Sequence, residues 1–200
     1  MWNVLHLFFP TMFLFLNPVK FIVMRPFISL QNAILDLPKA YDLRDSLKKH
    51  NKKTFPKRIP SRVNELIFHH TASKNMSVYD IAAMHVNQKD WPGIAYHVVI
   101  DTDGNIFLCN DLFSQTYHAK DHNFKSIGIC CLGNFEESEM PEVQEYSLML
   151  LTWLIATRFH ELKPLGHCDT KETLCPGQYY PLVEVKNHYA EGIKYRSIEM

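Results

Sequence analysis

Short apolar runs separated by polar turns predict four strands in the chain after residue 62. An Asp-Gly pair closes the segment 101–104 between two of these runs, and Asp-Gly is a strong signal for a β-hairpin turn. The run at 126–132 is almost continuously apolar, which is typical of a buried strand. The predicted strands are 63–69, 95–100, 106–109 and 126–132.

A 3.6-residue spacing of apolar positions predicts three helices, at 77–88, 141–160 and 181–196. Ser77 with Asp80 three residues later is an acidic form of the capping box, which marks the start of a helix. Pro141 suits the first turn of the second helix, with Ser138 or Glu139 as its cap. The order of strands and helices predicts a single α/β domain at 63–197, with a central mixed β-sheet flanked by helices.

Two segments precede this domain. Residues 1–24 are strongly apolar, but they lack the basic start and small-residue cleavage site of a signal peptide, and Pro10 and Pro18 interrupt them. They are either an export or anchoring segment or an upstream extension of the reading frame, with translation starting in practice at Met24. In the first case they would be the one part of the chain expected to contact a membrane. Residues 25–62 form a polar, basic lead-in. This lead-in is either a solvated wrap around the domain or a weak patch for an anionic wall polymer.

Charge and cysteine content narrow the function classes. The 200 residues carry 21 Lys plus Arg and 21 Asp plus Glu, so the formal net charge is zero. A protein that binds nucleic-acid phosphates needs an excess of basic residues, so we expect no nucleic-acid partner. Five cysteines cannot all pair within one chain, and adjacent Cys130 and Cys131 point to opposite faces of a strand. Free or metal-bound thiols are therefore expected instead of a disulfide framework.

Two segments are rich in residues that bind metals. His69 and His70 lie at the end of the first predicted strand, and His167 and Cys175 lie in a later pair of loops. Zinc prefers neutral imidazole and thiolate, and a catalytic zinc takes three protein ligands. One histidine from the strand, with His167 and Cys175, supplies that number. The spacing alone leaves an alternative open, in which the histidines are structural and Cys175 is a small buried apolar residue.

Six short fragments form a wider pattern along the chain. They are IFHHTA at 67–72, AYHVVI at 95–100, YHAK at 117–120, SIGI at 126–129 with GNF at 133–135, GHCD at 166–169 and TLCPG at 173–177. Their types and order resemble those of the zinc N-acetylmuramoyl-L-alanine amidases of the type-2 amidase and peptidoglycan-recognition-protein family, and amidase-type phage lysozymes are similar. The resemblance covers about residues 60–180.

The resemblance implies roles for six side chains. His69, His167 and Cys175 match the zinc ligands, Tyr96 and Thr173 match residues that assist catalysis, and His118 matches a histidine near the substrate groove. His70 stands at a position that varies in the family and is interpreted as a packing residue, a support for a ligand or the substrate-binding edge of the groove. Asp169 lies two residues after a ligand and is either an acceptor for a ligand histidine or a turn residue. One branch of the family has a glutamate at about the position of Cys130, so this chain departs from that branch and offers no carboxylate base there.

The resemblance also implies an activity: zinc-dependent hydrolysis of the amide bond between N-acetylmuramic acid and L-alanine in peptidoglycan, by a monomer. The site of action would be the cell envelope, periplasm or extracellular space if residues 1–24 direct export. Otherwise the protein would be cytoplasmic, or phage-encoded and released to the wall. The main alternative is a peptidoglycan-binding module without catalysis. A zinc hydrolase of another peptide and a non-enzymatic interaction protein are further alternatives.

Overall fold

A six-stranded mixed sheet forms the centre of the molecule, in the order β1-β4-β3-β5-β2-β6. The computed structural model describes residues 26–159 and 161–199. Neighbouring strands pair in parallel, except that β3 and β4 are antiparallel. The strands are β1 (Ala40–Asp42), β2 (Glu65–His70), β3 (Val98–Ile100), β4 (Ile106–Leu108), β5 (Ser126–Cys131) and β6 (Lys163–Gly166). The predicted α/β class with a mixed sheet is confirmed.

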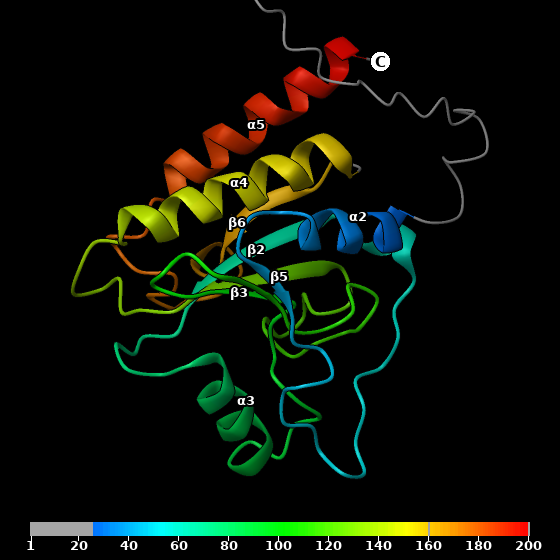
Figure 1. Ribbon diagram of the computed structural model, residues 1–200, viewed down its shortest axis with the longest axis vertical. Coiled ribbons are helices and arrows are strands. Elements are labelled where there is room, and N and C mark those ends of the chain that lie inside the picture. The colour runs from blue at the N-terminus through cyan, green and yellow to red at the C-terminus, as the bar shows by residue number, and fades with distance from the viewer. Residues whose placement is uncertain (1–25, 160, 200) are drawn as a thin grey trace, which may run out of the picture.

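Helices cover both faces of the sheet, but unequally. Helix α3 (Val78–Asn87) lies on one side, and α2 (Pro26–Leu35), α4 (Glu142–Arg158) and α5 (Leu182–Glu199) lie on the other (Figure 1). Two short 3₁₀ helices, η1 (Pro60–Arg62) and η2 (His167–Asp169), complete the elements of the described chain.

The alternation of side chains along each strand separates a large core on one face of the sheet from a smaller core and a minor cluster on the other. Leu66 and Phe68 of β2 belong to the large core under α4, whereas Val99 of β3 packs in a smaller core with α3. The adjacent cysteines follow the same rule, since Cys131 lies in the first core and Cys130 in the second. None of the five cysteines is paired in a disulfide.

Local sequence signals identified two features correctly. Ser77 caps α3 through a reciprocal pair of bonds with Asp80, which is the predicted capping box. The β3–β4 hairpin turns at Gly104, whose φ of 76° is in the left-handed region that favours glycine. The Asp101 carboxylate accepts bonds from backbone N–H groups within that turn and fixes its shape.

Several boundaries differ from the expectations. Neither Ser138 nor Glu139 caps α4; Pro141 occupies the N-cap position, with no side-chain bond. Strand β3 begins at Val98, three residues later than predicted, because the Ala95 N–H and the Tyr96 carbonyl bond to the side chains of His85 and Asn110. Strand β6 was not predicted. Nor were α2 and β1, which lie within the expected lead-in and contribute to the sheet and its main core.

The apolar segment 1–24, with its two interpretations, lies outside the described residues. Within the part of the chain that the structure describes, no helix combines the length and apolar character needed to cross a membrane.

Candidate metal centre

The two metal-type segments converge at one edge of the sheet. Strands β2 and β6 run in parallel, with Phe68 paired to Gly166, so His69 and His167 follow at neighbouring carboxyl ends. The loop after η2 returns to the same place, because the Cys175 carbonyl accepts a 2.8 Å bond from the Cys168 N–H. The fold thereby brings together three residues that the sequence separates by up to 106 positions.

These three side chains form a compact donor cluster. One ligand atom each from His69, His167 and Cys175 lies within 4.8 Å of the others. His69 Nδ1 lies 3.8 Å from Cys175 Sγ, and the two imidazole centroids are 4.5 Å apart. His167 Nε2 is buried with no hydrogen-bond partner among the described residues. An unpartnered buried nitrogen beside a second imidazole and a sulfur fits a tetrahedral zinc site with a fourth position for water.

Burial sets the protonation states of the cluster. Desolvation lowers the pKa of His167 to about 4 and that of His69 well below its usual value, with nearby Lys171 acting in the same direction. Desolvation raises the pKa of Cys175 to about 11, partly opposed by the His70 N–H, which donates to its sulfur. At neutral pH without a metal, the imidazoles are therefore neutral and the thiol keeps its proton.

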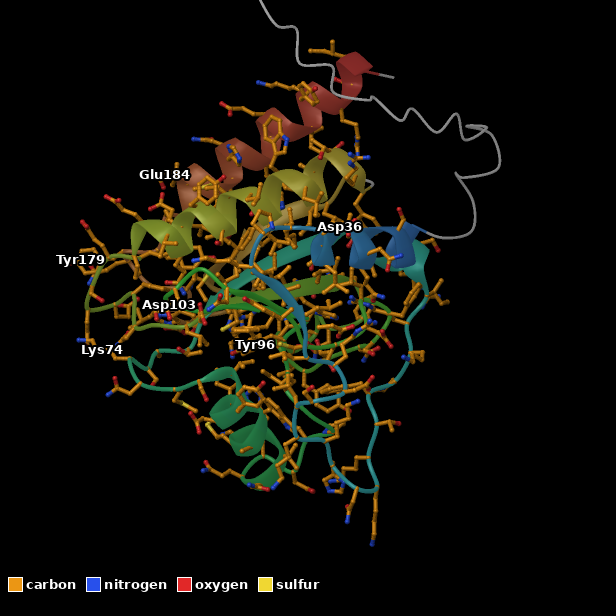
Figure 2. The ribbon with its side chains drawn as sticks, in the orientation of Figure 1. Asp36, Lys74, Tyr96, Asp103, Tyr179 and Glu184 are labelled. Carbon is orange, nitrogen blue, oxygen red and sulfur yellow. The ribbon has the colours of Figure 1, made fainter. Side chains whose placement is uncertain are left out.

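Tyr96 lies beside this cluster, on the α3 side of the sheet (Figure 2). Its ring centroid is 5.3 Å from that of His69. The Asn110 amide donates to the carbonyls of Ile94 and Tyr96 and holds this segment just before β3. Burial, followed by nearby Cys130 and Cys175, raises the pKa of Tyr96 well above its usual value. Its hydroxyl is therefore a hydrogen-bond donor throughout the neutral range.

Thr173 and Asp169 bond to the backbone that carries the cluster. Thr173 Oγ1 accepts a 3.3 Å bond from the Cys175 N–H. The Asp169 carboxylate accepts a 2.8 Å bond from the Gly166 N–H and pairs with Lys186 of α5 at 2.7 Å. Both side chains thus fix the loops on either side of His167 and Cys175. The hydrogen bond from a ligand histidine to Asp169, expected from its position two residues after His167, stays a prediction.

His70 and His118 are both buried. His70 lies on the opposite face from His69, stacks on Phe135 and accepts the Phe135 N–H through Nδ1. His118 is 6% exposed, and its Nδ1 lies 3.0 Å from His69 Nε2. The resemblance places His118 near substrate, and the groove edge is one interpretation of His70; both substrate roles stay predictions. No sequence signal indicated the contact between His69 and His118, which lie 49 positions apart.

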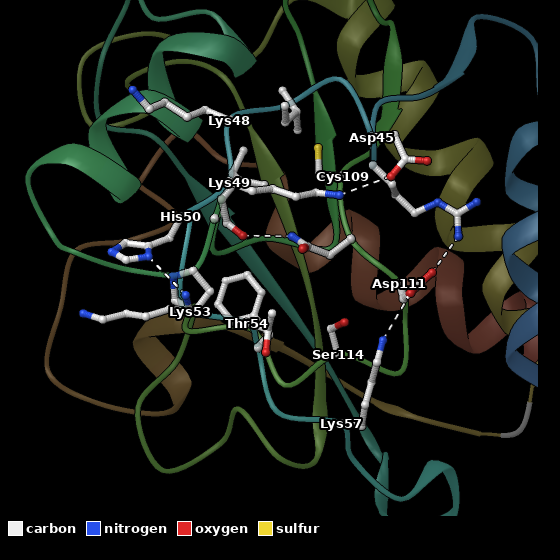
Figure 3. Close-up of a pocket in the computed structure, with 17 residues that line it drawn as sticks. Asp45, Lys48, Lys49, His50, Lys53, Thr54, Lys57, Cys109, Asp111 and Ser114 are labelled. Carbon is white, nitrogen blue, oxygen red and sulfur yellow. Dashed lines mark hydrogen bonds and ion pairs between the residues drawn. The ribbon is translucent and has the colours of Figure 1, made fainter.

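A separate cavity of about 620 Å³ lies under the basic lead-in (Figure 3). None of the three cluster residues lines it. Most cations at this cavity have acidic partners: Asp111 pairs with Arg44 and Lys57, and Asp90 pairs with Lys53. Lys49 pairs with Asp45. Because these charges are paired, the basic lead-in is better interpreted as a solvated segment that wraps around the domain than as a patch for an anionic polymer.

The mixed sheet and the His/His/Cys cluster define a single-domain α/β protein with a candidate catalytic metal centre. The model of the N-acetylmuramoyl-L-alanine amidase family matches residues 60–178, and the chain belongs to this family. The matched region runs from η1 to just beyond Cys175, so it includes every residue of the cluster.

Relatives come from two kinds of protein. A peptidoglycan-recognition protein of Drosophila simulans is 30% identical over 133 residues, covering 60% of this chain and 71% of the relative. The endolysin of Enterobacteria phage T3 is 28% identical over 126 residues, covering 58% of this chain and 83% of the relative. Among solved structures, the N-acetylmuramoyl-L-alanine amidase LysC from Clostridium intestinale URNW is similar, with a TM-score of 0.62 and 28% identity. That similarity covers 76% of this chain and 97% of LysC.

Proposed function

We propose that this protein is a zinc-dependent amidase that hydrolyses the bond between N-acetylmuramic acid and L-alanine in peptidoglycan. The observation that carries the proposal is the cluster of His69, His167 and Cys175, with an unpartnered buried nitrogen and a protonated tyrosine beside it. Membership of the amidase family and similarity to LysC and to a phage endolysin support it.

The three cluster residues would hold the zinc ion. Two neutral imidazoles and one thiolate leave about one net positive charge on the site. When bound, zinc polarises the scissile carbonyl and lowers the pKa of its water toward about 7. The chain contributes a fixed arrangement of donors, because strand ends and a bonded loop position all three side chains.

Tyr96 and Thr173 would assist the reaction from either side of the centre. The Tyr96 hydroxyl can donate to the oxyanion that develops on the carbonyl oxygen or to the attacking water, and it can return a proton to the leaving L-alanine amine. The Thr173 hydroxyl can donate likewise, since accepting the Cys175 N–H leaves its own hydrogen available. Cys130 lies beside Tyr96, and burial raises the pKa of its thiol well above the usual value, which makes it a poor base.

The proposal is tested by digesting purified peptidoglycan with the full-length chain and analysing the soluble products by mass spectrometry. We expect free stem peptides with a new L-alanine amino terminus, lost on chelation and restored by zinc. A protein that binds sacculi and zinc but releases no peptide would instead be a recognition module, as some relatives are named. Release of peptides cut at another bond would assign a different zinc hydrolase.

Zinc affinity should depend on pH in a definite direction. Since the pKa of Cys175 is about 11 and that of His167 about 4, binding at intermediate pH displaces about one proton, from the thiol. The apparent affinity is therefore expected to rise about tenfold per pH unit between about pH 6 and pH 8. Competition with a chelator of known proton affinity measures this slope. A slope of zero would contradict a thiol that is protonated in the metal-free protein.

A further inference from the structure

A hydrogen-bonded series of buried polar side chains begins at His69 Nε2, the ring nitrogen that does not face Cys175. His69 Nε2 lies 3.0 Å from His118 Nδ1, and His118 Nε2 lies 3.1 Å from Ser126 Oγ. Ser126 Oγ lies in turn 2.7 Å from the His122 carbonyl oxygen. His69, His118 and Ser126 are each buried, and each of these nitrogens and this hydroxyl has a protein partner.

The last acceptor in this series, the His122 carbonyl, determines which atom donates in each of its hydrogen bonds. A carbonyl oxygen only accepts, so the Ser126 hydroxyl donates to His122 and its oxygen can accept from His118. The Ser126 carbonyl, 3.4 Å from His118 Nε2, is a second acceptor on that nitrogen. His118 therefore carries its hydrogen on Nε2 and presents a lone pair at Nδ1.

That lone pair determines the tautomer of His69. A neutral His69 donates from Nε2 to His118 Nδ1, which leaves its own Nδ1 lone pair facing Cys175 Sγ. A metal ligand must present a lone pair at that place, and ligand imidazoles commonly donate their other N–H to a supporting group. The same hydrogen-bonded chain thus sets both the proton position and the orientation of the His69 ring.

The fold reserves space for the His118 ring. A Cβ on Gly128 of β5 would lie 2.6 Å from His118 Cγ and Nδ1, so the ring packs directly on the glycine backbone. The His118 and His69 rings meet edge to face, with centroids 5.1 Å apart. Gly128 is held in turn by its N–H, which donates to His97 Nδ1. Little freedom is left for His118 to turn away.

We propose that His118, supported by Ser126, is a positioning residue that holds His69 in the tautomer and orientation needed to bind the metal. The inference rests on the proposed function, because it takes His69 as a zinc ligand. His118 would act on the metal only through His69, since both its ring nitrogens are engaged by protein groups.

Zinc affinity of full-length variants, measured by chelator competition, tests the inference. We expect His118→Leu to weaken zinc binding by about 10- to 100-fold, as loss of a group supporting a ligand does. His118→Asn should bind zinc almost as the unsubstituted protein does, because its amide oxygen can accept from His69 Nε2. Ser126→Ala should weaken binding less than His118→Leu. The matched control is Ser147→Ala, a buried serine of α4 that donates to the Gly104 carbonyl, and it should leave zinc affinity unchanged.

A spectroscopic readout separates positioning from general loss of structure. Nitrogen-15 NMR of the full chain should show a coupling across the N–H···N bond between His69 Nε2 and His118 Nδ1. The coupling should persist in Ser147→Ala and disappear in His118→Asn while that variant still binds zinc. Thermal unfolding identifies any variant that fails to fold, and the Asn and Ser126 variants then decide the question.

The outcomes distinguish the inference from the function on which it rests. If the unsubstituted protein binds no zinc, the proposed amidase function fails and the positioning role fails with it. If it binds zinc and folded His118→Leu binds equally tightly, only the positioning role is overturned. Equal loss in Ser126→Ala and Ser147→Ala would likewise remove Ser126 from the chain of bonds.

Discussion

Replacing Cys175 by alanine is expected to remove stoichiometric zinc and to lower amidase turnover by more than about 10³-fold. Cys175 supplies the only sulfur of the described donor cluster and the only negative charge that the three residues can offer a cation. Without it, two neutral imidazoles remain. Metal analysis of the purified protein, together with peptide release from peptidoglycan, measures both effects. His69→Ala and His167→Ala should behave in the same way.

Cys168→Ala is the matched control for this experiment. Cys168 adjoins His167 in sequence and its N–H bonds to the Cys175 carbonyl, but its thiol is exposed and lies outside the donor cluster. We expect normal zinc content and turnover, because alanine keeps the backbone bond. Full activity in Cys175→Ala would overturn the ligand assignment, and equal losses in both variants would indicate damage to the loop.

The elements predicted correctly are those whose signals are local. The Ser77–Asp80 capping box and the turn at Gly104 each specify a backbone conformation within four residues. The buried strand β5 was evident because both of its faces are covered, which makes its sequence continuously apolar. Such signals depend little on the rest of the chain.

The elements that were missed owe their structure to partners far away in sequence. β6 contains Lys163 and Pro164 and pairs on one side only, so it lacks the pattern of a central strand. β1 is a short edge strand whose side chains are partly or fully exposed. Neither segment has an apolar repeat of its own. Parallel pairing with β2 and β4 makes them strands, and no local rule contains that information.

The candidate site likewise combines features that the sequence could predict with one that it could not. The ligand residue types and their loops could be predicted because zinc prefers imidazole and thiolate, and those residue types can be seen in the sequence. The contact between His118 and His69 could not, because it depends on β5 placing Gly128 beneath the His118 ring. Resemblance alone assigned His118 to the substrate. The distances add a connection to the metal ligand that only the folded chain creates.

Tyr96→Phe is expected to keep full zinc content and to lower kcat by about 10²- to 10³-fold, with a smaller effect on KM. The substitution removes one hydroxyl and leaves the ring that packs beside His69. If the hydroxyl stabilises charge that develops only in the transition state, its loss acts on kcat. Peptide release at saturating and limiting substrate separates the two constants, and metal analysis confirms that the centre is intact.

Tyr180→Phe is the matched control for this experiment, because Tyr180 resembles Tyr96 in burial and in its contact with a cysteine but occupies a different place in the fold. Each is a tyrosine whose pKa burial raises well above its usual value, and each hydroxyl meets a buried cysteine thiol, Cys130 for Tyr96 and Cys131 for Tyr180. Those cysteines are adjacent but point to opposite faces of the sheet, so Tyr96 lies beside the His69 ring whereas Tyr180 packs in the main core. A loss of turnover confined to Tyr96→Phe therefore reports chemistry at the metal centre. Equal losses in both variants would assign the effect to a buried hydroxyl bonded to sulfur, and unchanged turnover in Tyr96→Phe would remove Tyr96 from the mechanism.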